Sequence, residues 1–352
     1  MQKLTELLDG LSAPARLVEP AAEGSVRCLA CAHRCLIRPG KRGICQVRFN
    51  RDGELRAPWG YVAALQLDPV EKKPFAHLLP GARALTFGML GCDFHCDFCQ
   101  NWVTSQTLRD PQADFGARYV RAILPEQIVA QAVGSGAKVL VSSYNEPLIS
   151  TEWAVDIFKL AVGQGLRCAF VSNGHATPEA LAELRPWLTA YKIDLKSMQE
   201  KHYRELGGRL QAVLETIQQA RQLGLWVEVV TLVIPGYNDS NDELWDAARF
   251  ITSVSADIPW HVTAFHPDYR MEGVPPTPAA SLQRAAEIGQ EAGLRYVYAG
   301  NLPGRVGSLE DTFCPKCGAA LIQRRGYTIL ANRVSPQGTC PGCGAVIAGV
   351  WG

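Results

Sequence analysis

The chain lacks several features that define common functional classes. It has no apolar segment near its N-terminus and no run of about 18 apolar residues, so we expect neither secretion nor membrane insertion. It also lacks an excess of charge of either sign, because the formal net charge of its 352 residues is +1, which gives no support for electrostatic binding of nucleic acid. No GxGxxG turn follows a predicted strand, and this argues against dinucleotide binding.

The residues that are present indicate a globular metalloprotein. Apolar residues make up 47% of the chain and charged residues 20%, which allows a sizeable core and does not predict disorder. Eleven of the twelve cysteines fall into three tight groups with the spacing of metal ligands. In a chain without secretion signals, such groups indicate metals and a reducing cytoplasm rather than disulfides. The remaining one, Cys168, lies in an apolar stretch and is expected to be a small core residue.

The central cysteine group lies in a short loop, residues 91–99, that directly follows an apolar segment. Its thiols, Cys92, Cys96 and Cys99, have the spacing C-x3-C-x2-C. A 4Fe–4S cluster normally takes four cysteine ligands, and no fourth is apparent here, so one iron would be open to a ligand from outside the protein. The alternative is a three-thiol zinc site completed by a histidine such as His95.

The first cysteine group is an N-terminal quartet, Cys28, Cys31, Cys35 and Cys45, with the spacing C-x2-C-x3-C-x9-C. Four thiols so placed are expected to bind a metal, although His33 could replace one of them as a ligand. We favour zinc, because a unit of about 80 residues with a modest core gains most from a metal that stabilises folding. A second iron–sulfur cluster is the alternative.

The last cysteine group consists of two CPxCG knuckles separated by 22 residues, Cys314 with Cys317 and Cys340 with Cys343. This pattern predicts a zinc ribbon, with a rubredoxin-like iron site as the alternative.

Between the outer groups, apolar strands alternate with amphipathic helices. The predicted strands are 84–90, 138–143, 167–171, 189–194, 226–233, 261–265 and 295–299. Helices are predicted from Pro125, around 153–160, and near 178–187, 209–223, 242–254 and 279–292. We therefore predict an α/β fold, a full or partial (β/α) barrel over 81–305, with an N-terminal Cys-rich unit (1–80) and a C-terminal zinc ribbon (306–352). A doubly wound open sheet is the alternative fold. We expect Lys72 and Lys73, which precede the barrel, to be solvated.

Polar residues follow successive predicted strands, at the end of a barrel where ligands and catalysis gather. One such residue is commonly only a helix cap, but their recurrence beside the cysteine loop favours a shared site. They are Asn145, Glu146, Ser172, Asn173, Asp194, Lys196 and His266.

These motifs together resemble the radical S-adenosylmethionine (SAM) enzymes. The barrel resembles the pyruvate formate-lyase activating enzyme and its relatives, and the whole chain is similar to the radical SAM enzyme of the AmmeMemoRadiSam system. The matching pieces are Cys28-x2-Cys31-x3-Cys35, Glu71-Lys72-Lys73-Pro74, the run from Cys92 to Trp102, Tyr144-Asn145-Glu146-Pro147, Phe265-His266-Pro267-Asp268-Tyr269 and the closing ribbon.

The resemblance implies a role for each matched position. The three thiols of the cysteine loop would ligate a 4Fe–4S cluster whose open iron is chelated by SAM, and Phe98 would lie against the adenine. The other implied SAM contacts are Asn145 and Glu146 at the methionine amine, Ser172 and Asn173 at the next strand end, Asp194 and Lys196 at the ribose and carboxylate, and His266. Related activases often have an acidic residue, which contributes to a monovalent-cation site, just before the strand end that holds Ser172 and Asn173. Here that position is Val171, so the resemblance does not extend to such a cation site.

The implied activity is that of an oxidoreductase that reductively cleaves SAM to a 5′-deoxyadenosyl radical and abstracts hydrogen from an unidentified substrate. Implied partners are a reductant such as flavodoxin or ferredoxin, a small-molecule or protein substrate, and AmmeMemo proteins. One alternative is an activase that makes a glycyl radical on a partner protein. Another is a zinc-ribbon binding module on a catalytically silent barrel. The sequence identifies no general acid or base.

Overall fold

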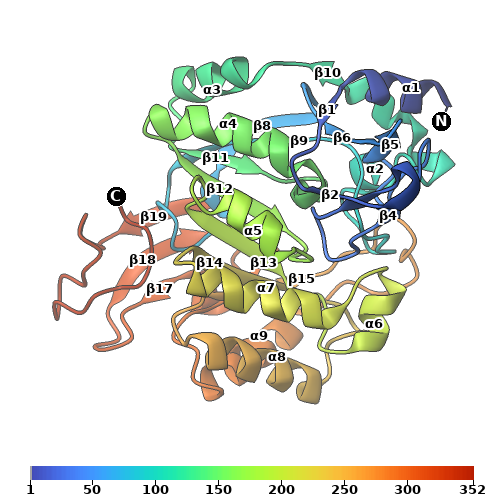
Figure 1. Cartoon of the computed structure of the whole chain (residues 1–352). Coiled ribbons are helices and arrows are strands. Elements are labelled where there is room, and N and C mark those ends of the chain that lie inside the picture. The colour runs from blue at the N-terminus through green and yellow to red at the C-terminus, as the bar shows by residue number, and fades with distance from the viewer. Residues whose placement is uncertain (1) are drawn as a thin grey trace.

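The computed structural model describes residues 2–352, apart from the side chains of residues 2, 3 and 114–117. Its centre is an eight-stranded sheet with the order β16-β15-β14-β13-β12-β11-β9-β8 (Figure 1). The strands from β9 to β16 run parallel, and β8 pairs antiparallel with β9 at one edge. The bounds are β8 (Ala64–Pro69), β9 (Arg83–Gly88), β11 (Val139–Ser142), β12 (Arg167–Ser172), β13 (Ala190–Asp194), β14 (Trp226–Val233), β15 (Trp260–Ala264) and β16 (Val297–Gly300).

The helices that connect these strands form one outer layer, visible in Figure 1. Each packs against the next along the chain, in the order α3, α4, α5, α7, α8 and α9. A doubly wound sheet would reverse its strand order and carry helices on both faces, so the observed order excludes that alternative. Within the described chain the edge strands β8 and β16 do not pair, so the barrel is partial. The helix bounds are α3 (Pro125–Gly134), α4 (Thr151–Gly163), α5 (Pro178–Leu184), α7 (Leu210–Gln222), α8 (Asn241–Val254) and α9 (Ala279–Glu291).

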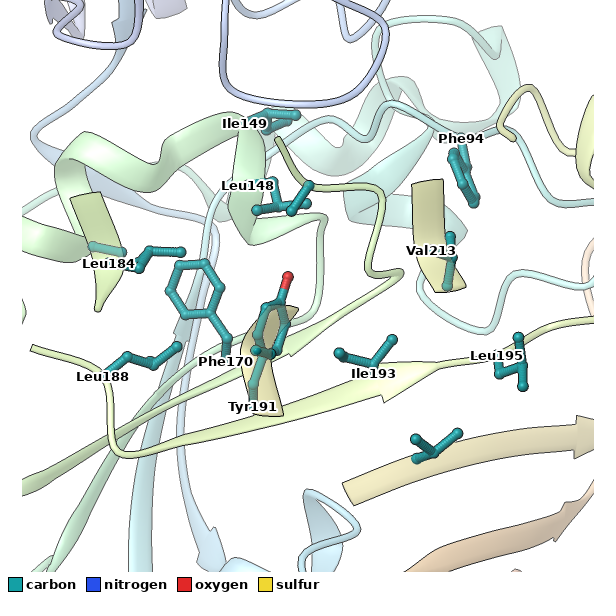
Figure 2. Close-up of a cluster of buried hydrophobic side chains, with 14 of the residues drawn as sticks. Phe94, Leu148, Ile149, Phe170, Leu184, Leu188, Tyr191, Ile193, Leu195 and Val213 are labelled. Atoms are coloured by element: carbon teal, nitrogen blue, oxygen red, sulfur yellow. The ribbon is translucent and has the colours of Figure 1, made fainter. Parts of the chain in front are cut away.

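The main core lies between the sheet and this helical layer. Phe170 and Tyr191 on adjacent strands pack with Leu184 of α5 and with Ile193, and all are fully buried (Figure 2). Side chains alternate along a strand, so the residue between Tyr191 and Ile193, Lys192, points to the opposite face, inside the barrel. The barrel interior therefore receives polar groups from β13.

The N-terminal segment forms small sheets around the start of the barrel. One has the order β1-β6-β5, another β2-β3-β4, and β7 pairs with β10. Since β8 belongs to the barrel sheet, residues 1–80 supply a barrel strand as well as the small sheets. The predicted division of the chain after residue 80 stays a prediction. The elements are α1 (Gln2–Gly10), β1 (Ser12–Pro14), β2 (Val18–Pro20), β3 (Val26–Cys28), β4 (Leu36–Ile37), β5 (Phe49–Arg51), β6 (Glu54–Pro58), β7 (Tyr61–Val62) and β10 (Arg121–Ala122).

The C-terminal segment forms an antiparallel sheet of β17 (Thr312–Phe313), β18 (Ala320–Arg325) and β19 (Thr328–Asn332). Its buried residues Leu321 and Ile322 pack with Tyr296 and Tyr298 beside the barrel edge. The end of the chain runs alongside the segment before β9, where Val350 N–H donates to the carbonyl oxygen of His77 at 2.7 Å. Across residues 2–352, no helix has the length and apolar character that crossing a bilayer requires.

The predicted strands agree with the observed ones to within two residues at each end. Several shorter elements between them were not predicted, among them α2 (Trp102–Ser105), α6 (Glu200–Glu205) and the 3₁₀ helix at Pro111–Tyr119. Cys168 is fully buried, as predicted. The expectation that Lys73 is solvated is wrong: the residue is 5% exposed, because its Nζ reaches Asp68 Oδ2 at 3.2 Å and Tyr144 Oη at 3.0 Å.

Candidate active site at the carboxyl ends of the strands

The cysteine loop follows β9 and carries its three thiols at the carboxyl edge of the sheet. The Phe94 N–H donates to Cys92 Sγ at 3.3 Å, and Cys99 Sγ lies 3.2 Å from Ser105 Oγ. Burial raises the pKa of all three thiols, that of Cys96 to about 12. Buried thiolates need positive charge beside them, which the irons of a cluster supply, and N–H and O–H donors on sulfur favour the same ionised form. The residues therefore fit a 4Fe–4S cluster.

A cationic group from β13 lies next to this loop. Asp194 is paired with Lys192 and with Lys196, whose Nζ lies 3.1 Å from Asp194 Oδ2. Burial would raise the pKa of Asp194, but the two ammonium groups outweigh it and lower the value to about 2. Lys196 also lies 6.0 Å from the ring centre of the buried Phe98, and its charge partly offsets the effect of burial on Cys96. The fold thus brings one predicted SAM-contacting residue, Lys196, to the cysteine loop, which itself carries another, Phe98.

The next two strand ends are joined through a buried carboxylate. Glu146 Oε1 accepts hydrogen bonds from Ser172 Oγ at 2.7 Å and Leu148 N at 3.0 Å, and Oε2 accepts one from Asn173 N at 2.8 Å. Burial, followed by the charge of Asp93, raises the pKa of Glu146 to about 8. The fourth predicted residue, Asn145, accepts from Met89 N at 2.9 Å. These four side chains lie together, but most of their hydrogen-bonding capacity is used within the protein.

His266 lies apart from that group. It is exposed and lines a cavity of about 580 Å³ that runs between the barrel and the C-terminal sheet. Gln100, next to the cysteine loop, borders the same cavity. Across from the barrel, the wall is formed by Arg324, Arg325 and Tyr327 of the β18–β19 hairpin.

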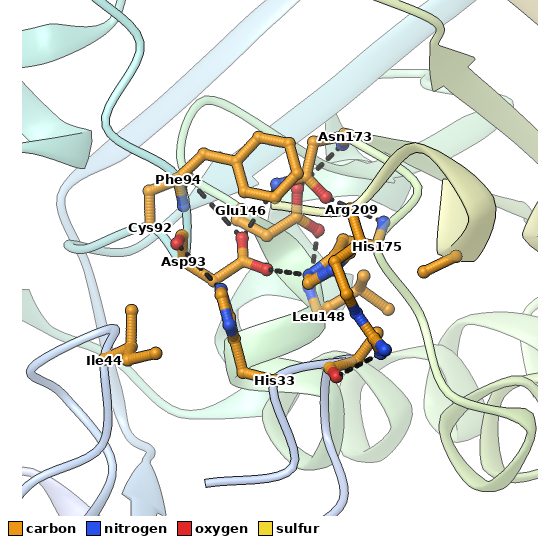
Figure 3. A network of polar contacts seen from close by, with 12 residues as sticks. His33, Ile44, Cys92, Asp93, Phe94, Glu146, Leu148, Asn173, His175 and Arg209 are labelled. Carbon is orange, nitrogen blue, oxygen red and sulfur yellow. Dashed lines mark hydrogen bonds and ion pairs between the residues drawn. The ribbon is translucent and has the colours of Figure 1, made fainter. Parts of the chain in front are cut away.

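Two acid–histidine pairs were missed from the sequence. Asp93 Oδ2 lies 3.0 Å from His175 Nδ1 (Figure 3), and Glu228 Oε2 lies 2.6 Å from His261 Nε2. Asp93 stands inside the cysteine motif and His175 two residues after Asn173, so both had a local signal. Glu228 and His261 lie within apolar strands, and the β14–β15 pairing brings them together.

The C-terminal thiols have the geometry of a single-ion site. Cys314 Sγ lies 3.6 Å from Cys343 Sγ, and Cys317 Sγ lies 3.7 Å from Cys340 Sγ. A tetrahedral zinc ion with Zn–S bonds of about 2.3 Å separates its sulfurs by about 3.8 Å. All four thiols converge within 4.8 Å of one another.

The N-terminal quartet does not converge in this way among the described residues. Cys31 instead lies within 4.8 Å of ligand atoms of Asp93 and His175. The ligand roles of Cys28, Cys35 and Cys45 stay predictions.

The site can be compared with known proteins. The family model of the radical SAM superfamily matches residues 87–251. An uncharacterised protein of Methanocaldococcus jannaschii is 37% identical over 312 residues, which cover 88% of this chain and 91% of that protein. The pyruvate formate-lyase-activating enzyme of Staphylococcus aureus is 26% identical over 197 residues, 53% of this chain and 76% of the enzyme. A solved radical SAM methyltransferase from Sphaerobacter thermophilus matches 88% of this chain and 81% of its own at 13% identity, with a TM-score of 0.49.

The chain contains a radical SAM domain at residues 87–251. Such a domain implies SAM and a 4Fe–4S cluster as cofactors, which the thiols of the cysteine loop fit. Its similarity to pyruvate formate-lyase-activating enzymes is distant.

Proposed function

We propose that this protein reductively cleaves SAM and uses the resulting 5′-deoxyadenosyl radical to abstract hydrogen from a substrate. The observation that carries the proposal is the cysteine loop itself, which places three buried or half-buried thiols, without a fourth, beside Lys196 at the carboxyl edge of a partial barrel. When bound, the cluster and SAM supply the electron transfer and the radical, and the protein orients them and excludes water.

The charges of SAM indicate how the surrounding residues act. SAM carries a carboxylate, an amine and a sulfonium, so its site needs both a cation and acceptors. We assign Lys196 to the SAM carboxylate as its cation, and Glu146 with Asn145 to the amine. Asp194 is assigned to the ribose and Phe98 to the adenine.

We place the substrate in the cavity between barrel and ribbon. Its volume of about 580 Å³ suits a small molecule or a short peptide segment. His266 and Gln100 border the cavity near the cysteine loop, so one end of a bound substrate lies close to that loop. Arg324 and Arg325 line the opposite wall and contact the other end of the substrate. The electron donor is a small reductant such as flavodoxin or ferredoxin, in the reducing cytoplasm that free thiols require.

An activase is the second candidate, and the similarity to a pyruvate formate-lyase-activating enzyme favours it. It predicts a glycyl-radical signal in electron paramagnetic resonance when the protein is mixed with a glycyl radical enzyme encoded next to its gene. A catalytically silent barrel predicts loss of a cluster thiol or of Asp194 or Lys196, and all of these are present.

The test is SAM cleavage by anaerobically reconstituted, reduced protein, measured as 5′-deoxyadenosine and methionine. Cys96→Ala should abolish cleavage, because two thiols do not hold the cluster. Cys168→Ala is the matched control: it removes a buried thiol that lies outside the loop, and it should cleave SAM normally. Turnover at the wild-type rate by Cys96→Ala would overturn the assignment.

A further inference from the structure

The cavity between the barrel and the C-terminal sheet carries two consecutive arginines on one wall. Arg324 and Arg325 both border it from the end of β18. The pairing of β18 with β19 shifts by one residue directly before Arg324. A shift of this kind, as in a β-bulge, increases the local twist of the strand, which allows two consecutive side chains to border the same cavity. The wall that faces the barrel is therefore cationic.

The guanidinium of Arg324 is held in place by uncharged groups. The residue is 8% exposed, and its Nη1 donates to Thr312 Oγ1 at 2.8 Å and to the carbonyl oxygen of Glu310 at 3.3 Å. Its Nη2 donates to the carbonyl oxygen of Ala76 at 2.8 Å, and the group lies 5.6 Å from the ring centre of Tyr298. Its Nε is buried and has no hydrogen-bond partner in the described chain. Arg324 is thus a fixed cation without a counter-charge at hydrogen-bonding distance, a costly arrangement unless a ligand supplies the charge.

The side chain of Arg325 is free to bind a ligand. It is exposed and borders the cavity, and among the described residues it has neither a hydrogen bond nor an ion pair. Lys72, a third cation on this cavity, is instead paired with Asp68 at 2.9 Å. Two like charges on one wall repel each other, so an anion bound between the arginines would be stabilised by both.

Two carboxylates also border the cavity, but neither forms an ion pair with these arginines in the described chain. Glu310 accepts hydrogen bonds from the N–H groups of Gly326 at 2.7 Å and Gly304 at 2.8 Å. Glu71 accepts one from the Gly81 N–H at 2.7 Å, and burial raises the pKa of its carboxyl group, which favours the uncharged form. The positive charge of the wall therefore remains available to a ligand.

We propose that the substrate carries an anionic oxygen group, a carboxylate or a phosphate, which binds Arg325 and lies beside the fixed charge of Arg324. This inference rests on the proposed function, because it concerns the substrate in the same cavity. A guanidinium presents paired N–H donors that match the oxygens of either group. With the anion held at this wall, the other end of the substrate lies near Gln100 and His266, beside the cysteine loop. The C-terminal sheet thus selects and orients the substrate.

The experiment titrates the reconstituted full-length protein, without SAM, with three probes. Succinate represents a carboxylate, inorganic phosphate represents the other anion, and succinamide is a neutral analogue of succinate. Saturation-transfer NMR gives the Kd for succinate and succinamide, and line broadening in phosphorus NMR gives the Kd for phosphate. Wild type should bind at least one anion and should not bind succinamide. The anion with the lower Kd identifies the group.

The decisive variant is Arg325→Gln, which loses no hydrogen bond or ion pair within the described chain and should therefore fold. It should raise the Kd of the anion about tenfold or more, and Arg325→Lys should retain part of the affinity. Arg333→Gln is the matched control. That arginine is also exposed in the C-terminal segment but lies outside the cavity wall, so the Kd should stay at the wild-type value.

Three results would each overturn the proposal: saturable binding of neither anion, equal affinity for succinate and succinamide, or an unchanged Kd in Arg325→Gln. SAM cleavage by the wild-type protein, measured in parallel, tests the proposed function separately. Cleavage of SAM without anion binding would refute the anion site alone. Anion binding that depends on Arg325, without SAM cleavage, would refute the radical chemistry and leave the anion site in place.

Discussion

Replacing Lys196 by methionine removes an ammonium group and keeps most of the side-chain length. The native side chain is 15% exposed, and its Nζ lies 3.1 Å from Asp194 Oδ2. Burial alone would lower the pKa of Lys196, but the charge of Asp194 outweighs it and raises the pKa, so the group is a cation at neutral pH. We expect the Lys196→Met protein to fold but to bind SAM weakly.

The magnitude follows from how the charges are shared. In the variant Asp194 still has Lys192 as its partner, so the fold does not inherit an unpaired carboxylate. The variant therefore loses the pairing between Lys196 and the SAM carboxylate. Removing one partner of a largely buried ion pair costs about 3–5 kcal/mol, here of SAM binding free energy. At about 1.4 kcal/mol for each factor of ten, the Kd for SAM should rise roughly a hundredfold to several thousandfold.

The assay is isothermal calorimetry of SAM binding to anaerobically reconstituted protein with matched cluster content. Lys201→Met is a control, because that side chain is 79% exposed and its 3.9 Å pair with Glu205 is solvated, and it should bind SAM like wild type. Lys196→Arg, which keeps the charge, should recover much of the affinity. If Lys196→Met binds SAM with the wild-type Kd, Lys196 is not the partner of the carboxylate.

Two further predictions concern stability. Glu152→Ala should lower the free energy of unfolding by about 3–5 kcal/mol in guanidinium titrations, because it leaves the Arg48 charge buried without its partner; a loss under about 1 kcal/mol would contradict this. Burial lowers the pKa of His77 to about 4, so the unfolded chain binds this proton near pH 6.5 and the folded chain only near pH 4. The free energy of unfolding should therefore fall as the pH drops from about 6.5 to 4, by at most about 1.4 kcal/mol per pH unit. An equal slope in the His77→Gln protein would show that His77 is not the cause.

The parts of the molecule that could be predicted are those in which the determining residues are close in sequence. The three thiols of the cysteine loop lie within eight residues, so their spacing alone indicates one site. Each CPxCG knuckle is equally local, and the two assemble at distances that suit one ion. The strands were predictable because buried parallel strands are apolar runs, whatever they pair with.

Features that depend on distant contacts were decided only by the tertiary structure. Hydropathy assigns a lysine to solvent, but Lys73 is buried because Asp68 and Tyr144 lie where they can satisfy its charge.

The cavity between barrel and C-terminal sheet was also decided only by the tertiary structure, because its walls come from segments more than 200 residues apart. The quartet spacing grouped Cys31 with its sequence neighbours, yet the fold sets it beside Asp93 and His175. Spacing along the chain determines which ligands can share a loop, whereas strand order and loop packing determine which loops meet, and that second step has no local signature in the sequence.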